Sequence, residues 1–126
     1  MSRTNDLRKL IQTKLSTISN NVYYENAIET AGYPHIVFTL DKINLGDLSR
    51  EDYTLDIDVW DRGSSASVIE ELCDEIEDLF DAENLPQDTV LPTFFKDTRN
   101  VVDDTDKTIK HRNLKFVVQN YSIGGN

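Results

Sequence analysis

The sequence predicts an α+β fold: a mainly antiparallel sheet of about five strands, with two helices packed on one face, in the order α-β-β-β-α-β-β. Two segments repeat apolar residues at helical spacing, and several others alternate apolar and polar residues or form short β-branched runs. The 126 residues are about the length of one domain, so residues 1–126 are expected to form a single unit. The other sheet face should be polar and solvated, or covered by another subunit.

The first half of the chain predicts one helix and three strands. Apolar residues at helical spacing run from Leu7 to Ile18, with Thr4, Asn5 or Asp6 as the N-cap. A short strand is expected to start at Val22. The proline of Tyr33-Pro34 favours an extended chain, and the apolar run His35 to Leu40 should be a central strand.

The next strand, around YTLDIDVWDR, alternates strictly. Tyr53, Leu55, Ile57 and Val59 point to one face and are predicted to be core, while Thr54, Asp56, Asp58 and Trp60 point to the other. The acidic, Gly46-containing stretch before it, residues 41–52, is expected to be a long hairpin connection.

The second helix is expected after the turn Gly63-Ser64-Ser65, with Ser67 and Glu70 forming a capping box. One face carries an apolar stripe that includes Cys73. The opposite face carries seven carboxylates: Glu70, Glu71, Asp74, Glu75, Glu77, Asp78 and Asp81. Two strands should follow, about Phe94 to Val102 and Asn113 to Ile123, joined by a polar loop over residues 103–112.

Composition excludes several classes of protein. The formal net charge of −10 argues against a protein that grips phosphate backbones, because that needs clustered Lys and Arg. With one cysteine, neither an intramolecular disulfide nor a multi-cysteine zinc site can form, so a reducing compartment fits best. No signal peptide or membrane span is evident, and the protein is expected to be cytoplasmic, without a membrane partner.

Catalytic sites are weakly indicated. Asp56 and Asp58 share a strand face and, with Asp103, Asp104 or Asp106, could hold Mg2+. The same pattern is typical of a half-solvated strand, and we favour that interpretation. Cys73 should be buried and inert with a raised pKa, and no pattern links His35 to His111. We therefore predict no catalytic, cofactor-binding or metal residue, and no enzyme activity.

Interface residues are better indicated. Trp60 lies beside acids on the outer face, and tryptophan is enriched at the centres of interfaces, although a buried sheet edge would explain it equally. Leu45 and Leu48 lie in the otherwise polar 41–51 loop. We predict interface roles for these residues and for the 103–111 linker, represented by Asp104 and Lys107.

The order of these segments resembles a known family. The helix LRKLIQTKL, then VYYENA, YPHIVFTL, YTLDIDVWDR, the helix SASVIEELCDEIEDLF and the final strand RNLKFVVQNY are similar to the small tail-terminator or tail-completion proteins of long-tailed bacteriophages and prophage-derived tail particles. The resemblance covers most of the chain and concerns core pattern and order. It carries no catalytic signature.

The resemblance implies a structural protein that forms a ring, typically of six copies, on the end of the tail tube. Such a ring stops tube growth and offers a surface to a head-tail connector protein, or caps the tube in headless particles. It would assemble in the host cytoplasm and remain in the particle. DNA would pass without specific binding, because fixed negative charge repels phosphates. A head-completion role, a metal-dependent enzyme and a small acidic binding module such as a DNA mimic remain as alternatives.

Overall fold

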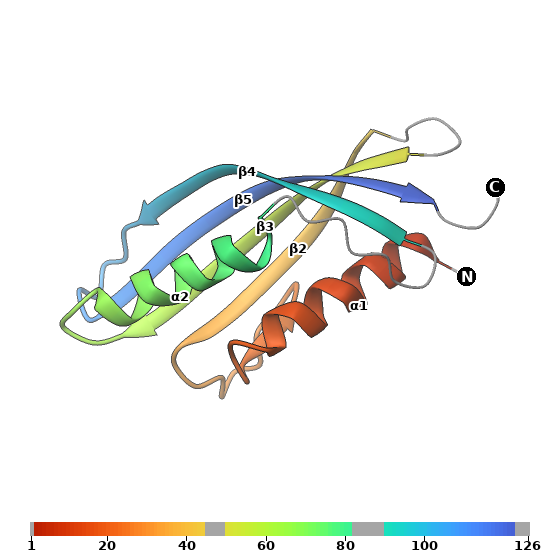
Figure 1. The fold of residues 1–126 in the computed structure, drawn as a ribbon. Helices are drawn as coiled ribbons and strands as arrows, with labels where there is room; N and C mark the ends of the chain where they lie inside the picture. Colours follow the sequence, from red (N-terminus) through yellow and green to blue (C-terminus); the bar gives the residue numbers. More distant parts are fainter. Residues whose placement is uncertain (1, 45–49, 82–89, 123–126) are drawn as a thin grey trace.

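The computed structural model describes residues 2–44, 50–81 and 90–122. It has the predicted α+β fold in the predicted order (Figure 1). The elements are α1 (Arg3–Ser16), β1 (Val22–Tyr24), β2 (His35–Asn44), β3 (Arg50–Arg62), α2 (Ser67–Leu79), β4 (Val90–Val102) and β5 (Ile109–Ser122).

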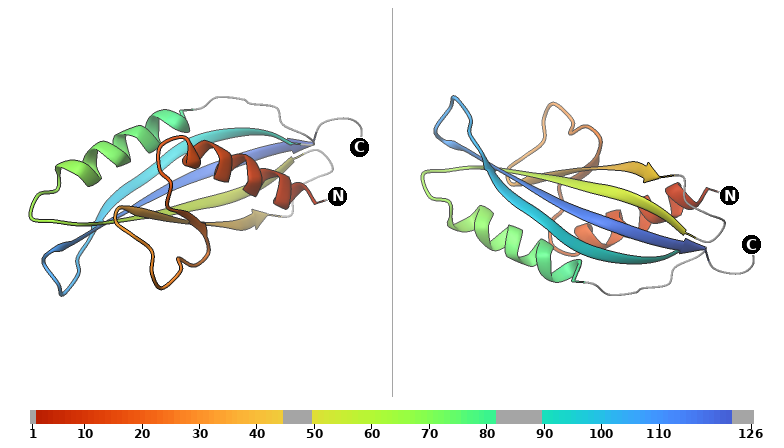
Figure 2. Two further views of the ribbon diagram at one scale, coloured as in Figure 1. Left: turned by 90° about the horizontal axis from the view of Figure 1, so that it is seen from below. Right: turned by 90° about the horizontal axis from the view of Figure 1, so that it is seen from above.

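The sheet has five strands in the order β1-β2-β3-β5-β4. All neighbouring pairs are antiparallel except β1 and β2, which are parallel, so the sheet is mixed. Both helices lie on one face of the sheet, as the two views of Figure 2 show. The opposite face, which we call the open face, has no layer over it in the described part of the chain.

Helix α1 begins at Arg3, about one turn before Leu7, the first residue of its apolar pattern. Its N-cap is Ser2, whose Oγ accepts a hydrogen bond from the Asn5 backbone N–H at 3.1 Å. The predicted caps at Thr4, Asn5 or Asp6 were therefore wrong. Periodicity locates the buried stripe, but polar residues before the stripe can continue the helix until a side chain caps it.

Helix α2 begins at Ser67, and its N-cap is Ala66, which makes no side-chain cap hydrogen bond. The predicted capping box was therefore wrong. The Ser67 N–H instead donates to Ser65 Oγ at 3.1 Å. The Glu70 carboxylate accepts from the Arg99 guanidinium at 2.8 Å, a charge-assisted bond that is stronger than a bond to a neutral backbone N–H.

The strands are longer than predicted. The loop predicted over residues 103–112 is shorter, because β5 already begins at Ile109. Its polar first residues pair with the end of β3, as Trp60↔His111 and Arg62↔Ile109 show. Strand β2 similarly continues to Asn44 and β3 starts at Arg50, which narrows the predicted 41–52 connection.

The core lies between the sheet and the helices. The predicted inward residues of β3 are all buried, at 1% exposure or less. They pack with α1 and α2 side chains and with β5, in a cluster that includes Leu7, Ile11, Ile69, Ile76, Phe80, Leu114 and Phe116. Cys73 belongs to this cluster, and burial raises the pKa of its thiol to about 11, as predicted.

An ionic cluster around the buried Glu51 carboxylate ties α1 to the sheet. Arg3 donates two hydrogen bonds to the Glu51 carboxylate, each 3.1 Å long, and Lys42 Nζ lies 2.9 Å from the same group. The Tyr53 hydroxyl lies 2.8 Å from the Thr4 hydroxyl and 3.3 Å from Glu51. The hydrogen bonds from Arg3 and Lys42 lower the pKa of Glu51 to about 2, against the effect of its burial.

Candidate functional site

A row of aromatic rings crosses one end of the open face. Trp60 stands between two histidine rings: His35 on β2 has its centroid 5.2 Å away, and His111 on β5 has its centroid 4.3 Å away. Both pairs are nearly parallel, at 23° and 20°. Tyr33 lies 5.1 Å beyond His35, and the Arg62 guanidinium stacks over Tyr33.

The register of the sheet brings these rings together. His35 pairs with Trp60 and Trp60 pairs with His111 across three neighbouring strands, so the side chains point to the same face. No sequence pattern links His35 to His111. The missing information was the position of β5, whose first residues had been predicted as loop.

Next to the rings, a polar ladder follows β3 and β5. The His111 ring Nε2 lies 2.8 Å from Asp58, and the Asn113 amide donates to Asp58 at 3.0 Å and also to Asp56. Lys115 Nζ lies 2.9 Å from Asp56. The structure therefore places Asp56 and Asp58 side by side, as predicted, with a hydrogen-bond partner already present for each carboxylate.

This ladder bears on the Mg2+ hypothesis. A metal at Asp56 and Asp58 would have to displace Lys115 and Asn113. Asp106 is engaged elsewhere, since hydrogen bonds from Thr108 lower its pKa and Arg62 lies 3.6 Å from it. In the described ranges, no group of three or more His, Cys, Asp or Glu residues is arranged to hold a metal ion. The arrangement favours the interpretation that Asp56 and Asp58 are the polar residues of a half-solvated strand over the interpretation that they bind Mg2+.

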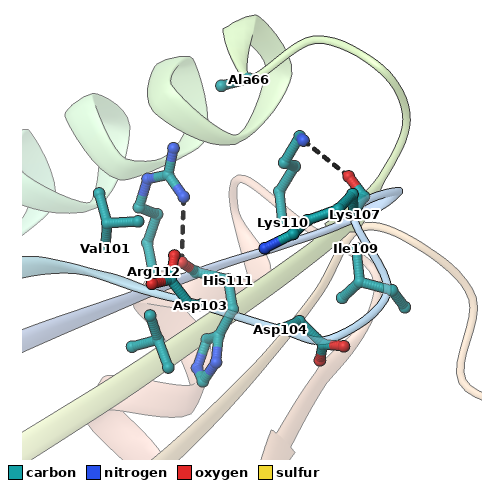
Figure 3. A pocket seen from close by; sticks show the side chains of 10 residues that line it. Ala66, Val101, Asp103, Asp104, Lys107, Ile109, Lys110, His111 and Arg112 are labelled. Carbon is teal, nitrogen blue, oxygen red and sulfur yellow. Dashed lines mark hydrogen bonds between the residues drawn. The ribbon is translucent and has the colours of Figure 1, made fainter.

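The turn between β4 and β5 encloses a hollow of about 210 Å3, shown in Figure 3. Its apolar lining includes Ala66 and Val101, and its basic lining includes Lys107, Lys110 and Arg112. Lys110 Nζ donates to the Lys107 carbonyl at 2.9 Å, as Figure 3 shows, and no carboxylate within the described residues pairs with either ammonium group.

Acids and a buried arginine complete the lining. Asp103 is exposed, and the Asp104 carboxylate accepts from the Asp106 N–H at 2.9 Å, which shapes the turn. The Arg112 guanidinium is only 8% exposed and donates to the His111 carbonyl at 3.0 Å. The hollow therefore offers another molecule the ammonium groups of Lys107 and Lys110, beside the exposed carboxylate of Asp103.

Three of the predicted interface residues fall in these two places. Trp60 lies in the ring stack, with both faces covered, so it can present only an edge to a partner. Asp104 and Lys107 both line the hollow. Leu45 and Leu48 lie outside the described residues.

The carboxylates of α2 form two rows that differ in their partners. Arg99 on β4 binds the inner row: it reaches Glu70 at 2.8 Å and Asp74 at 2.7 Å, and it contacts Glu77. Lys96 lies 3.7 Å from Asp81. The outer row is exposed and has no ion pair within the part of the chain that the structure describes. It comprises Glu71, Glu75 and Asp78.

The fold has a counterpart among solved structures. It is similar to a chain in the virion of a native gene transfer agent (GTA) particle, with a TM-score of 0.77 and 10% sequence identity, over 94% of this chain and 96% of that chain. At this identity the likeness shows a shared fold. No protein family and no curated protein matches the sequence. No helix among the described residues is long and apolar enough to cross a membrane.

Proposed function

We propose that this protein is a structural component of a phage-type tail that forms a ring on the end of the tail tube. The ring stops tube growth and provides the surface for head joining or for capping. The observation that carries this proposal is the likeness to a chain of the GTA virion, which spans nearly all of both chains. The resemblance of the sequence pattern to tail terminators supports it independently.

The chemistry of the open face also favours assembly over catalysis. The Asp56 and Asp58 carboxylates are held by β5 side chains, and Trp60 is fixed between two rings. The polar side chains of this surface are thus hydrogen-bonded to one another. A face with half-buried rings suits contact with another protein.

The distribution of charge fits a particle through which DNA passes. The chain carries a formal charge of −10, and the outer carboxylates of α2 are exposed without cationic partners among the described residues. A ring of several copies multiplies this charge, and like charge keeps phosphate backbones from adhering. The expected partners are therefore other copies of the chain, the tail tube protein and a head-tail connector protein, with no specific binding of DNA.

The test is co-sedimentation with purified tail tubes of the same particle, followed by negative-stain imaging of the tube ends. We expect rings on one end of each tube, and tubes of defined length when the protein is present during assembly. Tubes whose ends stay bare and whose length is unchanged would overturn the proposal. Binding to isolated heads instead of tubes would assign the protein to head completion.

A further inference from the structure

Two surfaces at opposite edges of the sheet are complementary to each other. We propose that the segment of residues 25–34 of one copy docks into the β4–β5 hollow of the next copy, and that this contact builds the ring. The inference rests on the proposed ring function and names the surfaces that would make it.

The first surface is the segment between β1 and β2. Ile28 is 58% exposed, and Glu25 and Glu29 on either side of it form no ion pair within the described residues. The segment contains no Lys or Arg. Its shape is fixed by hydrogen bonds of 2.9 Å from Glu25 N–H to Phe38 O and 3.0 Å from Ala31 N–H to Ile28 O. It is a defined apolar knob with acidic flanks.

The second surface is the hollow. Val101 on its lining is 65% exposed. Val101 and Ile28 have the highest exposures among the large apolar side chains of the described residues. Lys107 and Lys110 supply two ammonium groups without carboxylate partners there. An isoleucine with two flanking glutamates therefore finds an apolar contact in Val101 and opposite charges in Lys107 and Lys110, provided that the glutamates approach the lysines and not the exposed Asp103.

The positions of the two surfaces favour contact between copies. His35, Trp60, His111 and Val102 are register partners in one row across the sheet. The segment of residues 25–34 directly precedes His35, at the β2 end of the row. The hollow is lined by Val102, at the β4 end of the row. Both lie at the same end of the molecule in Figures 1 and 2.

Three strand spacings, about 14 Å in total, separate β2 from β4. The knob and the hollow of one chain are thus kept apart by the sheet. A contact between two different patches is heterologous, and repetition of such a contact closes a ring if the rotation per copy allows it.

The experiment uses the full chain and two charge insertions, Ile28→Asp in the knob and Val101→Asp in the hollow. Both sites are exposed, so the variants should fold, and circular dichroism checks this. The matched control is Phe95→Asp, because Phe95 is also exposed, at 44%, in the middle of β4 and outside both surfaces. Self-association is measured by sedimentation velocity and by the fraction of tube ends that carry rings.

We expect each insertion to lower tube-end occupancy at least about ten-fold, because it puts a charge at the centre of an apolar contact, while Phe95→Asp behaves like the wild type. Mixing the two variants should give a one-to-one dimer and no ring, because only one intact knob and one intact hollow remain per pair. Lys107→Glu with Lys110→Glu should also break rings, and adding Glu25→Lys with Glu29→Lys should restore them.

Rings from Ile28→Asp at wild-type level would overturn the docking inference and leave the tail role intact. Failure of the wild type to cap tubes, together with a knob-to-hollow dimer in the mixture, would instead overturn the tail role and support the contact.

Discussion

The two faces of β3 use their carboxylates differently. On the helix side, Glu51 is 7% exposed and holds Arg3, Lys42 and Tyr53, so that it fastens α1 to the sheet. On the open face, Asp56 and Asp58 are half-buried and bind only side chains of the adjacent strand. The same chemical group therefore joins two layers on one face and merely lines one layer on the other.

The largest effect is expected from Glu51→Ala. Removing the carboxylate breaks its charge-assisted hydrogen bonds with Arg3 and Lys42 and should lower the free energy of unfolding by about 3 kcal/mol. Urea denaturation measures it, with Glu71→Ala on the exposed outer row of α2 as the control, which should change stability by less than about 0.5 kcal/mol. If both variants lost the same free energy of unfolding, Glu51 would not have the structural role that distinguishes the helix side of β3 from the open face.

Acid should act on the same group. The pKa of Glu51 is about 2 in the folded protein and about 4.5 in the unfolded chain. Between these two pH values the folded state therefore binds fewer protons than the unfolded state. The stabilisation is complete above pH 4.5 and is lost as the pH falls from there to about 2 and below, by about 3 kcal/mol in total. Thermal unfolding at several pH values should show this slope in the wild type. In Glu51→Gln the part due to this residue should vanish, and an unchanged slope would contradict the assignment.

The open-face ladder should matter less. Asp58→Asn keeps the shape and removes the charge that faces His111, and a half-exposed pair of this kind contributes about 0.5 to 1 kcal/mol. Denaturation at pH 7 measures it, and Asp56→Asn next to Lys115 provides the matched comparison. A loss as large as that of Glu51→Ala would show that the open face is also a structural joint.

The smallest effect is expected from divalent cations. Asp56 and Asp58 already have hydrogen-bond partners, so millimolar Mg2+ or Mn2+ should leave the melting temperature unchanged to within about 1 °C. Differential scanning fluorimetry tests this with Asp56→Asn as the reference. A rise of several degrees that disappears in Asp56→Asn would restore the metal hypothesis.

Local pattern was enough to predict much of the fold. Strict alternation from Tyr53 to Val59 identified both the strand and its buried face, and the helical spacing around Cys73 predicted that this residue is buried. These predictions succeeded because burial acts on every second or every third to fourth residue, whatever the distant parts of the chain do.

The site was harder to predict because it depends on long-range pairing. The Trp60 stack needs the register that places His35 and His111 on either side of it, and the acidic inner row of α2 needs Arg99 from a strand that follows later. The parallel pairing of β1 with β2 was also missed. Local alternation fixes which face of a strand is buried, but the partner strand and its direction depend on distant parts of the chain.

The burial of Cys73 has a practical consequence. It is the only cysteine in the chain, and its thiol is buried with a pKa of about 11, so it stays protonated and inaccessible to alkylating reagents at neutral pH. A surface cysteine introduced by mutation would then be the sole reactive thiol. The natural background is thus already suited to attaching a fluorophore or gold label at one chosen position, and to following each copy as it joins an assembly.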